Sequence, residues 1–214
     1  MSEDSTIIDP LLAGEAPTGE TEDHGHEGHH KAGKVLRDWV VVIAVALAAA
    51  LVVRVYVLQQ FYISGPSMET TMFSNDRVLV NKLSYRLHDI HRGDVVVFDR
   101  VTMNGSVVAH DDLIKRVIGL AGETVEIRRC TVYIDGKPLD EPYLPSRDTN
   151  QSDPTARCRV VTMRPVEVPT SHIFVMGDNR PESFDSRSFG SISESLVVGR
   201  AFAVVWPLGR MKTL

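Results

Sequence analysis

The chain has 214 residues, a formal net charge of −5 and two cysteines. This length allows one sizeable domain with additional segments, and the acidic balance excludes the basic footprint of a nucleic-acid-binding protein. The cysteines, Cys130 and Cys158, are too few for a disulfide-rich scaffold and lack the spacing of zinc ligands. One bridge between them is compatible with a domain outside the cytoplasm, and two unpaired thiols are the alternative.

Residues 1–33 predict a disordered, cytoplasmic tail. Acidic residues are frequent, the first thirty residues hold no Lys or Arg, and apolar residues show no periodicity. The tract His24–His30 is rich in histidine, which can bind Zn or Ni. A solvated polar tail is the interpretation we favour, because no neighbouring cysteine or ordered carboxylate completes a rigid site. We therefore expect neither a metal nor another cofactor.

Residues 36–58 predict a transmembrane helix. The run from Trp39 to Leu58 is apolar except for Arg54, and about 20 such residues span the hydrocarbon core of a bilayer. Arg54 lies near the end of the run, where a long side chain can reach the interface. A cleaved signal peptide is one alternative, but the run is long for one and follows a long acidic tail. A buried core helix is another, but such helices are usually amphipathic.

The flanks of this run predict its orientation. Lys31, Lys34 and Arg37 precede the run, whereas after Arg54 the next basic residue is Arg77. Lys and Arg are enriched in cytoplasmic flanks. We therefore expect a single pass through the plasma membrane, with the N-terminus in the cytoplasm and the following domain outside it. The lipid bilayer is then one partner of the chain.

Residues 61–214 predict a mainly β domain, since short Val- and Ile-rich segments alternate with turn residues. Asp135-Gly136 is a hairpin turn signal, and residues 84–90 can form one helical turn. Residues 140–169 are rich in proline, and we expect them to form a surface insertion. The expected strands are residues 77–81, 94–98, 113–120, 124–128, 131–134, 172–176 and 197–206.

A serine in a restricted backbone follows the apolar run. Ser67 comes directly after Gly65 and Pro66; glycine permits positive φ, whereas proline fixes φ and has no N–H. A hydroxyl held in one orientation suits a nucleophile. Gly, Pro and Ser are also ordinary turn residues, so a plain turn is the alternative.

Two adjacent cations lie inside the apolar segment 113–120. Side chains alternate between the two faces of a strand, so Lys115 and Arg116 point in opposite directions, and at least one of them enters apolar surroundings. Burial lowers the pKa of a lysine, whereas arginine stays charged. Lys115 is therefore a candidate general base for Ser67. An edge strand with both cations in water is the alternative.

The sequence contains two further groups of polar residues with possible roles in a site. A Ser-His-Asp triad based on His110 is disfavoured, because its acidic neighbours Asp111 and Asp112 cannot easily orient the ring from the far side. The run 176–187 is crowded with polar residues and is compatible with a solvated loop. Asp185 and Arg187 can instead form a bidentate pair that fixes this run, with Ser183 placed to bond a buried amine.

The chain resembles the bacterial type I signal peptidases, which are membrane-anchored serine endopeptidases that remove signal peptides from exported preproteins. The resemblance covers about residues 39 to 207 and rests on four motifs in chain order, of which the last is long and specific. The motifs are Gly65-Pro66-Ser67-Met68, Arg92–Phe98, Ile114–Leu120 and Gly177–Arg187.

The resemblance implies a Ser/Lys dyad without a metal: Ser67 would be the nucleophile and Lys115 the unprotonated base. Some family members supply an oxyanion donor from a serine two residues before the nucleophile, where this chain has Gly65. The supporting residues would be Ser183, which bonds the Lys115 amine, the pair Asp185 and Arg187, and Asp178, which helps to hold their loop.

The resemblance also implies a substrate. A signal peptide would bind as an extended strand and be cut after small residues. A non-catalytic, membrane-tethered β domain that binds export partners is the alternative function, and the sequence does not indicate the oligomeric state. The substrate pockets would be formed by Ile63, Met68, Met72, Leu113 and Ile114.

Overall fold

The computed structural model describes residues 27–104, 107–145 and 158–214, and the chain divides into two compact units, 1–47 and 48–214. Most of the predicted tail, including the start of its histidine tract, lies outside the described residues. Helix α1, Glu27–Val52, contains one stretch, Gly33–Val52, that is long and apolar enough to cross a membrane. No second such helix occurs among the described residues. One N-terminal apolar helix agrees with an association with the membrane.

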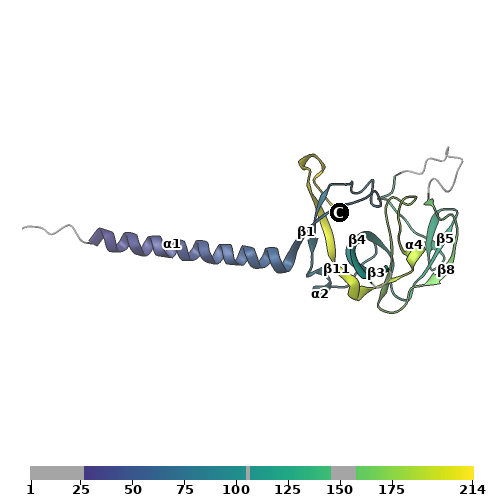
Figure 1. The fold of residues 1–214 in the computed structure, drawn as a ribbon, viewed down its shortest axis with the longest axis horizontal. Coiled ribbons are helices and arrows are strands. Elements are labelled where there is room, and N and C mark those ends of the chain that lie inside the picture. Colours follow the sequence, from purple (N-terminus) through teal and green to yellow (C-terminus); the bar gives the residue numbers. More distant parts are fainter. Residues whose placement is uncertain (1–26, 105–106, 146–157) are drawn as a thin grey trace, which may run out of the picture. The chain divides into compact units, whose positions relative to one another are not determined.

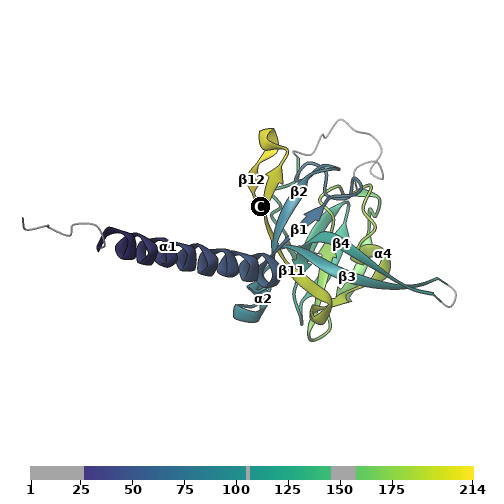
Figure 2. The same cartoon turned by 60° about the vertical axis from the view of Figure 1, so that its left-hand side comes forward.

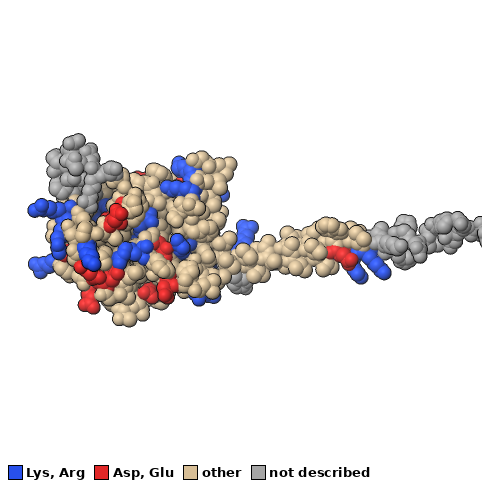
Figure 3. Space-filling model, turned by 180° about the vertical axis from the view of Figure 1, so that it is seen from behind, with Lys and Arg blue, Asp and Glu red and all other residues tan. Residues whose placement is uncertain are grey.

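The helix boundaries differ slightly from the sequence prediction. Helix α1 begins at Glu27, so the last residues of the predicted tail are helical. A wide helical turn, η1 (Val53–Val57), follows α1, and strand β1 starts at Leu58. The strand therefore begins three residues before the predicted start of the β domain. In Figure 3 most of the helix carries no charged side chains, whereas both signs of charge are scattered over the visible face of the β-rich unit.

The larger sheet of the β-rich unit has eight strands, in the order β1-β2-β11-β3-β4-β9-β10, with β12 paired to β11. Strands β3 and β4 pair from Val95↔Arg116 to Asn104↔Val107 and form the long hairpin of Figure 2. The bounds are β1 Leu58–Tyr62, β2 Arg77–Asn81, β3 Val95–Asn104, β4 Val107–Gly119, β9 His172–Met176, β10 Ile192–Ser193, β11 Val197–Trp206 and β12 Lys212–Thr213.

The smaller sheet has the order β7-β6-β5-β8 and lies beside the larger one in both ribbon views (Figures 1 and 2). Asp135 and Gly136 have positive φ angles of 49° and 76°, which a two-residue hairpin turn requires. The predicted turn is therefore confirmed. The bounds are β5 Thr124–Arg128, β6 Thr131–Ile134, β7 Lys137–Pro138 and β8 Met163–Glu167. The short helical elements are α2 Ser84–Leu87, α4 Ser186–Phe189, η2 Glu194–Leu196 and η3 Leu208–Arg210.

The proline-rich region differs from the expected surface insertion. Strand β8 lies within it and pairs with β5, although its sequence contains Pro165. Cys158 is buried and forms a disulfide bond with Cys130, which answers the question that the sequence left open. Residues 146–157 lie outside the described part. The described part of the region is thus attached to the smaller sheet.

Two of the buried clusters place the functional residues. The first lies under β1, β2, β3 and β11 and includes Met68 and Met72, which are fully buried. The second joins the two sheets through Ile118 and Phe174 on one side and Val125 on the other. At Gly119 a Cβ atom would lie 2.5 Å from a Val125 methyl carbon, so only glycine allows the sheets to approach this closely.

Candidate active site

The segment around Ser67 is held by its own turn and by the core beneath it. Gly65 has φ +93°, in the region that glycine adopts without strain. The backbone then turns, with Glu69 N donating to Pro66 O at 2.9 Å and Met72 N to Met68 O at 2.8 Å. Met68 is fully buried next to Ser67. The hydroxyl of Ser67 is therefore presented by a rigid turn.

A second loop fastens this turn. Asn179 N donates to Ser67 O at 3.0 Å, and Asn179 Nδ2 donates to Pro66 O at 3.0 Å. A Cβ atom at Gly177 would overlap with the Ser67 carbonyl oxygen and the Ser183 side chain. The loop after β9 thus packs directly on the backbone that carries Ser67.

Lys115 reaches Ser67 from β4, 48 residues further along the chain. Its Nζ lies 2.7 Å from Ser67 Oγ and donates to Ile114 O at 2.8 Å. Only 3% of Lys115 is exposed. The strand places Lys115 across from Val96, in the interior of the sheet. An edge strand with both cations in water is therefore wrong.

Burial favours the neutral form of the Lys115 amine. Burial lowers the pKa of Lys115 to about 8, and the carboxylates of Asp185 and Asp178 oppose this decrease. Burial dominates because an ammonium group loses its hydration there. With a pKa near 8, about one Lys115 amine in ten is unprotonated at pH 7, and its lone pair then lies next to the Ser67 hydroxyl.

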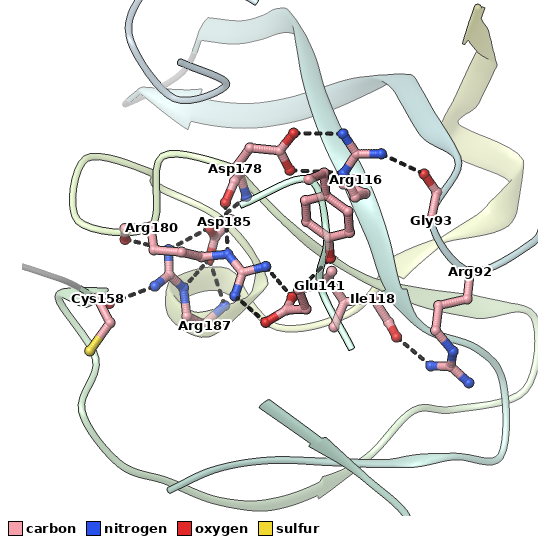
Figure 4. A network of polar contacts seen from close by, with 12 residues as sticks. Arg92, Gly93, Arg116, Ile118, Glu141, Cys158, Asp178, Arg180, Asp185 and Arg187 are labelled. Atoms are coloured by element: carbon pink, nitrogen blue, oxygen red, sulfur yellow. Dashed lines mark hydrogen bonds and ion pairs between the residues drawn. The ribbon is translucent and has the colours of Figure 1, made fainter. Parts of the chain in front are cut away.

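Asp178 forms a buried bidentate pair with the other cation of the strand. Arg116 Nε donates to Asp178 Oδ1 at 2.9 Å, and Arg116 Nη2 donates to Oδ2 at 2.6 Å (Figure 4). Arg116 Nη1 also donates to Gly93 O at 2.8 Å. The hydroxyl of Thr71 donates to Asp178 as well. Asp178 thus connects β4, the turn after Ser67 and the loop after β9.

Asp185 and Arg187 form the bidentate pair that the sequence suggested. Arg187 Nε donates to Asp185 Oδ1 at 2.8 Å, and Nη2 donates to Oδ2 at 2.7 Å. Asp185 also accepts from Gly177 N at 3.0 Å. Burial would raise the pKa of Asp185, but the Arg187 bonds outweigh it and hold the pKa of this carboxyl below its ordinary value. The carboxylate is therefore charged and fixes the loop.

Ser183 is placed differently from the sequence prediction. Its side chain is buried, and its hydroxyl makes no hydrogen bond of standard geometry among the described residues, including none to Lys115. The hydroxyl lies near enough to the Asp185 carboxylate to help lower the pKa of that carboxyl. Ser183 packs against the position of Gly177, so it belongs to the site even though it does not contact the amine.

A small open pocket lies beside Ser67 and Lys115, between the end of β1 and the middle of β4. Three of the five predicted pocket residues, Ile63, Leu113 and Ile114, line it. Met68 and Met72 lie in the core instead, fully buried beneath Ile63. The lining residues that the sequence did not single out are Phe61, Tyr62, Ser64, Val97 and Asp112.

Other residues of the site carried little or no signal in the sequence. His110 Nδ1 lies 2.7 Å from Asp99 Oδ2 on the β3–β4 hairpin. His110 lies opposite Val101, nearer the tip of the hairpin than Lys115, which lies opposite Val96. Glu141 accepts a hydrogen bond from Arg180, and the Tyr143 ring contacts Arg116. Both residues lie in the proline-rich region, and no sequence pattern indicated a role for them. Among the described residues, no group of three or more His, Cys, Asp or Glu side chains could hold a metal ion.

Comparisons with known proteins place the chain in one family. The model of the family "Signal peptidase, peptidase S26" matches residues 36–206. Signal peptidase IB of Staphylococcus aureus is 36% identical over 186 residues, which cover 84% of this chain and 94% of that protein. Signal peptidase I of Leptolyngbya laminosa is 34% identical over 186 residues, covering 86% of each chain. A crystal structure of a signal peptidase I from Enterococcus faecalis V583 matches with 34% identity and a TM-score of 0.41, covering 53% of this chain and 97% of that one.

Proposed function

This chain belongs to the signal peptidase family, peptidase S26, and from this we propose that it is a membrane-anchored serine endopeptidase that removes signal peptides from exported preproteins. One observation carries the proposal: a buried lysine amine lies 2.7 Å from the hydroxyl of a serine in a rigid turn. A serine hydroxyl is a weak nucleophile until a neighbouring base removes its proton. The site holds such a base in Lys115.

The dyad gives a complete acyl-transfer sequence. Unprotonated Lys115 Nζ takes the proton of Ser67 Oγ as that oxygen attacks the scissile carbonyl carbon. The resulting ammonium returns the proton to the leaving amine, and an acyl-enzyme ester on Ser67 remains. Lys115 then takes a proton from water, which attacks the ester and restores the free hydroxyl. Every step uses the same lone pair on Nζ, so the protonation state of Lys115 governs all of them.

The tetrahedral intermediate needs donors for its oxyanion. The Ser67 N–H donates no hydrogen bond among the described residues, and it is available for this purpose. Gly65 supplies no side chain, so a second donor must come from backbone or water. An oxyanion donor contributes about 3 kcal/mol to transition-state stabilisation, which makes the backbone around Gly65 functionally important.

The polar residues around the dyad have a supporting role in this proposal. Asp185 and Arg187 fix the loop through a buried ion pair, and Asp178 joins that loop to β4 through Arg116. Ser183 fills the space next to Gly177. These residues keep Lys115 in reach of Ser67.

The substrate lies along the pocket beside β4. An extended peptide can add to the free edge of a strand through backbone hydrogen bonds. β4 pairs with β9 only from Arg116 onward, which leaves the edge before it open. The narrow pocket lined by Ile63, Leu113 and Ile114 accepts small side chains before the cut. Signal peptides are therefore the proposed substrates, and the bilayer is the second proposed partner.

The anchor is the stretch Gly33–Val52 of α1. We propose that it crosses the plasma membrane once, with the N-terminus in the cytoplasm, because Lys31, Lys34 and Arg37 cluster at its N-terminal end. The β-rich unit is then extracytoplasmic, where translocated preproteins emerge and where the Cys130–Cys158 bridge is stable.

Substitution of the dyad tests the proposal. Ser67→Ala and Lys115→Met should each lower processing of a purified preprotein in detergent to background, whereas Asp140→Asn, an exposed change in the same unit, should leave it intact. Preprotein that is still cut by both dyad variants, after removal of other proteases, would refute the dyad, whereas a wild type that cuts no preprotein would favour the non-catalytic binding domain.

A further inference from the structure

Three arginines with little exposure surround the carboxylates next to Lys115. Arg116 binds Asp178, Arg187 binds Asp185, and Arg180 Nε donates to Gly177 O at 3.0 Å. Each of these arginines also has a partner from the proline-rich region, and Figure 4 shows Glu141 next to Arg180 and Cys158 next to Arg187. These partners are the ring of Tyr143 for Arg116, the carboxylate of Glu141 for Arg180, and the carbonyl of Cys158 for Arg187.

Glu141 and Tyr143 act as a pair. Glu141 accepts from both Nη atoms of Arg180, and the two side chains are 5% and 7% exposed. The Tyr143 hydroxyl donates to Glu141 Oε1 at 2.8 Å, while its ring lies 4.0 Å from the guanidinium carbon of Arg116. Burial raises the pKa of Tyr143, so its hydroxyl remains a donor. One short segment thus contacts two of the three arginines.

Cys158 holds the third arginine. Its carbonyl accepts from Arg187 Nη1 at 2.7 Å. The disulfide bond joins Cys158 to Cys130, in the turn between β5 and β6, and Cys130 N donates to Val161 O at 3.0 Å. The smaller sheet therefore fixes the position of a carbonyl that binds an arginine of the site. Without the bridge, only the backbone that leads into β8 ties this acceptor to the sheet.

We propose that Glu141, Tyr143, Cys158 and the bridge to Cys130 form an arginine clamp that positions the charges around Lys115. This inference rests on the proposed function of Lys115 as the base, and it assigns the clamp residues a positioning role. The charged groups near the amine are Asp178 and Asp185, their arginine partners, and Asp112 at the pocket. By holding the arginines in place, the clamp sets how far the negative charges of Asp178 and Asp185 are neutralised.

The two ends of the clamp should act in opposite directions. Loss of the bridge loosens Arg187 without changing any charge, so Asp185 attracts a proton on Lys115 more strongly and the pKa of Lys115 rises. Neutralisation of Glu141 releases the positive charge of Arg180 toward Asp178, so the pKa of Lys115 falls. Charges interacting through a partly buried site shift a pKa by about half a unit or more.

The test is a direct titration of Lys115 in the full chain in detergent micelles. The NMR signal of its ε-methylene group is followed with pH and identified by its loss in Lys115→Met. We expect a midpoint near 8 for the wild type, about half a unit higher for the double variant Cys130→Ser/Cys158→Ser, and about half a unit lower for Glu141→Gln. Asp140→Asn is the matched control, because it removes an exposed carboxylate one residue away and should leave the midpoint unchanged.

Two outcomes overturn the inference. Midpoints equal to the wild-type value in both clamp variants mean that the clamp does not act on Lys115. Lower thermal stability with an unshifted midpoint means that the residues are only structural. If the double variant does not fold, folded wild type treated with a thiol reductant is titrated instead, and an unmoved midpoint contradicts the proposal. The titration needs no turnover, so failure of the proposed protease activity is detected separately.

Discussion

At the scale of single residues, burial of Lys115 destabilises the folded chain but makes the lysine amine easier to deprotonate. Lys115 is almost fully buried without a direct carboxylate partner among the described residues, and its pKa falls from 10.5 to about 8. In the unfolded chain this lysine binds its proton up to pH 10.5. Between pH 8 and 10.5 the unfolded state therefore holds more protons than the folded one, so stability rises with pH across this window. Below pH 8 the full cost of burying the charge is present.

Replacement of Lys115 by methionine should separate stability from function. The neutral side chain fills nearly the same volume without the buried charge, so at pH 7 the free energy of unfolding should increase by about 3 kcal/mol. Denaturant unfolding at pH 7 and at pH 10 measures this. The gain should shrink at the higher pH. A variant that is less stable than the wild type at pH 7 would show that the ammonium is not destabilising there.

A second residue-scale prediction concerns the contact between the two loops. Gly177→Ala places a methyl group against Ser67 O and the Ser183 side chain, so the turn that carries the nucleophile must move. Processing of preprotein should fall about 100-fold, because a shift near 1 Å at reacting groups has that effect. Gly209→Ala, where a Cβ atom has nothing within 4 Å, is the control and should keep wild-type activity. Equal processing by the Gly177→Ala and Gly209→Ala variants would show that the two loops can move apart without loss of activity.

At the scale of elements, the Asp185–Arg187 ion pair is one of the contacts that hold the loop between β9 and α4. Asp185 is fully buried against Arg187, accepts from Gly177 N, and caps α4 by accepting from Arg187 N. Asp185→Asn keeps the shape but leaves the arginine without its charge partner. Removing one member of a buried pair costs about 3–5 kcal/mol. Thermal unfolding should show this loss, with Glu182→Gln on the same loop as the control; unchanged stability would contradict the account.

The sequence predicted the elements well where hydrophobic patterning decides them. The strands of residues 77–81, 124–128, 131–134, 172–176 and 197–206 were placed with their observed bounds. β1 was missed because it directly follows the apolar run and contains Gln59 and Gln60, so it is not a Val- or Ile-rich segment. β8 was missed because proline normally marks irregular backbone, whereas an edge position tolerates it. The observed contact between Ser67 and Lys115, by contrast, agrees with what a restricted serine turn and a lysine in an apolar strand predict.

What the sequence did not reveal depends on long-range contacts. Glu141 and Tyr143 have no local pattern, and only the folded chain brings them to Arg180 and Arg116. Met68 and Met72 were expected to line the pocket, but the turn after Ser67 directs both into the core. The resemblance to type I signal peptidases is confirmed by the family match over residues 36–206.

At the scale of the whole molecule, the proposal requires the apolar helix to anchor the chain in the membrane and the β-rich unit to lie on the outer side of that membrane. Protease added to intact spheroplasts should degrade the β-rich unit and spare an epitope placed at the N-terminus. After lysis both should be degraded. Protection of the β-rich unit in intact spheroplasts would reverse the proposed orientation.

The central claim is that an unprotonated Lys115 activates Ser67. Single-turnover cleavage of a preprotein by the full chain, measured from pH 5 to pH 10, tests it most directly. The rate constant should rise about tenfold per pH unit in the acidic range and level off above a midpoint near 8, the pKa of Lys115. A rate that is independent of pH across this range, or one that still rises tenfold between pH 9 and pH 10 as for an ordinary lysine, would contradict the account.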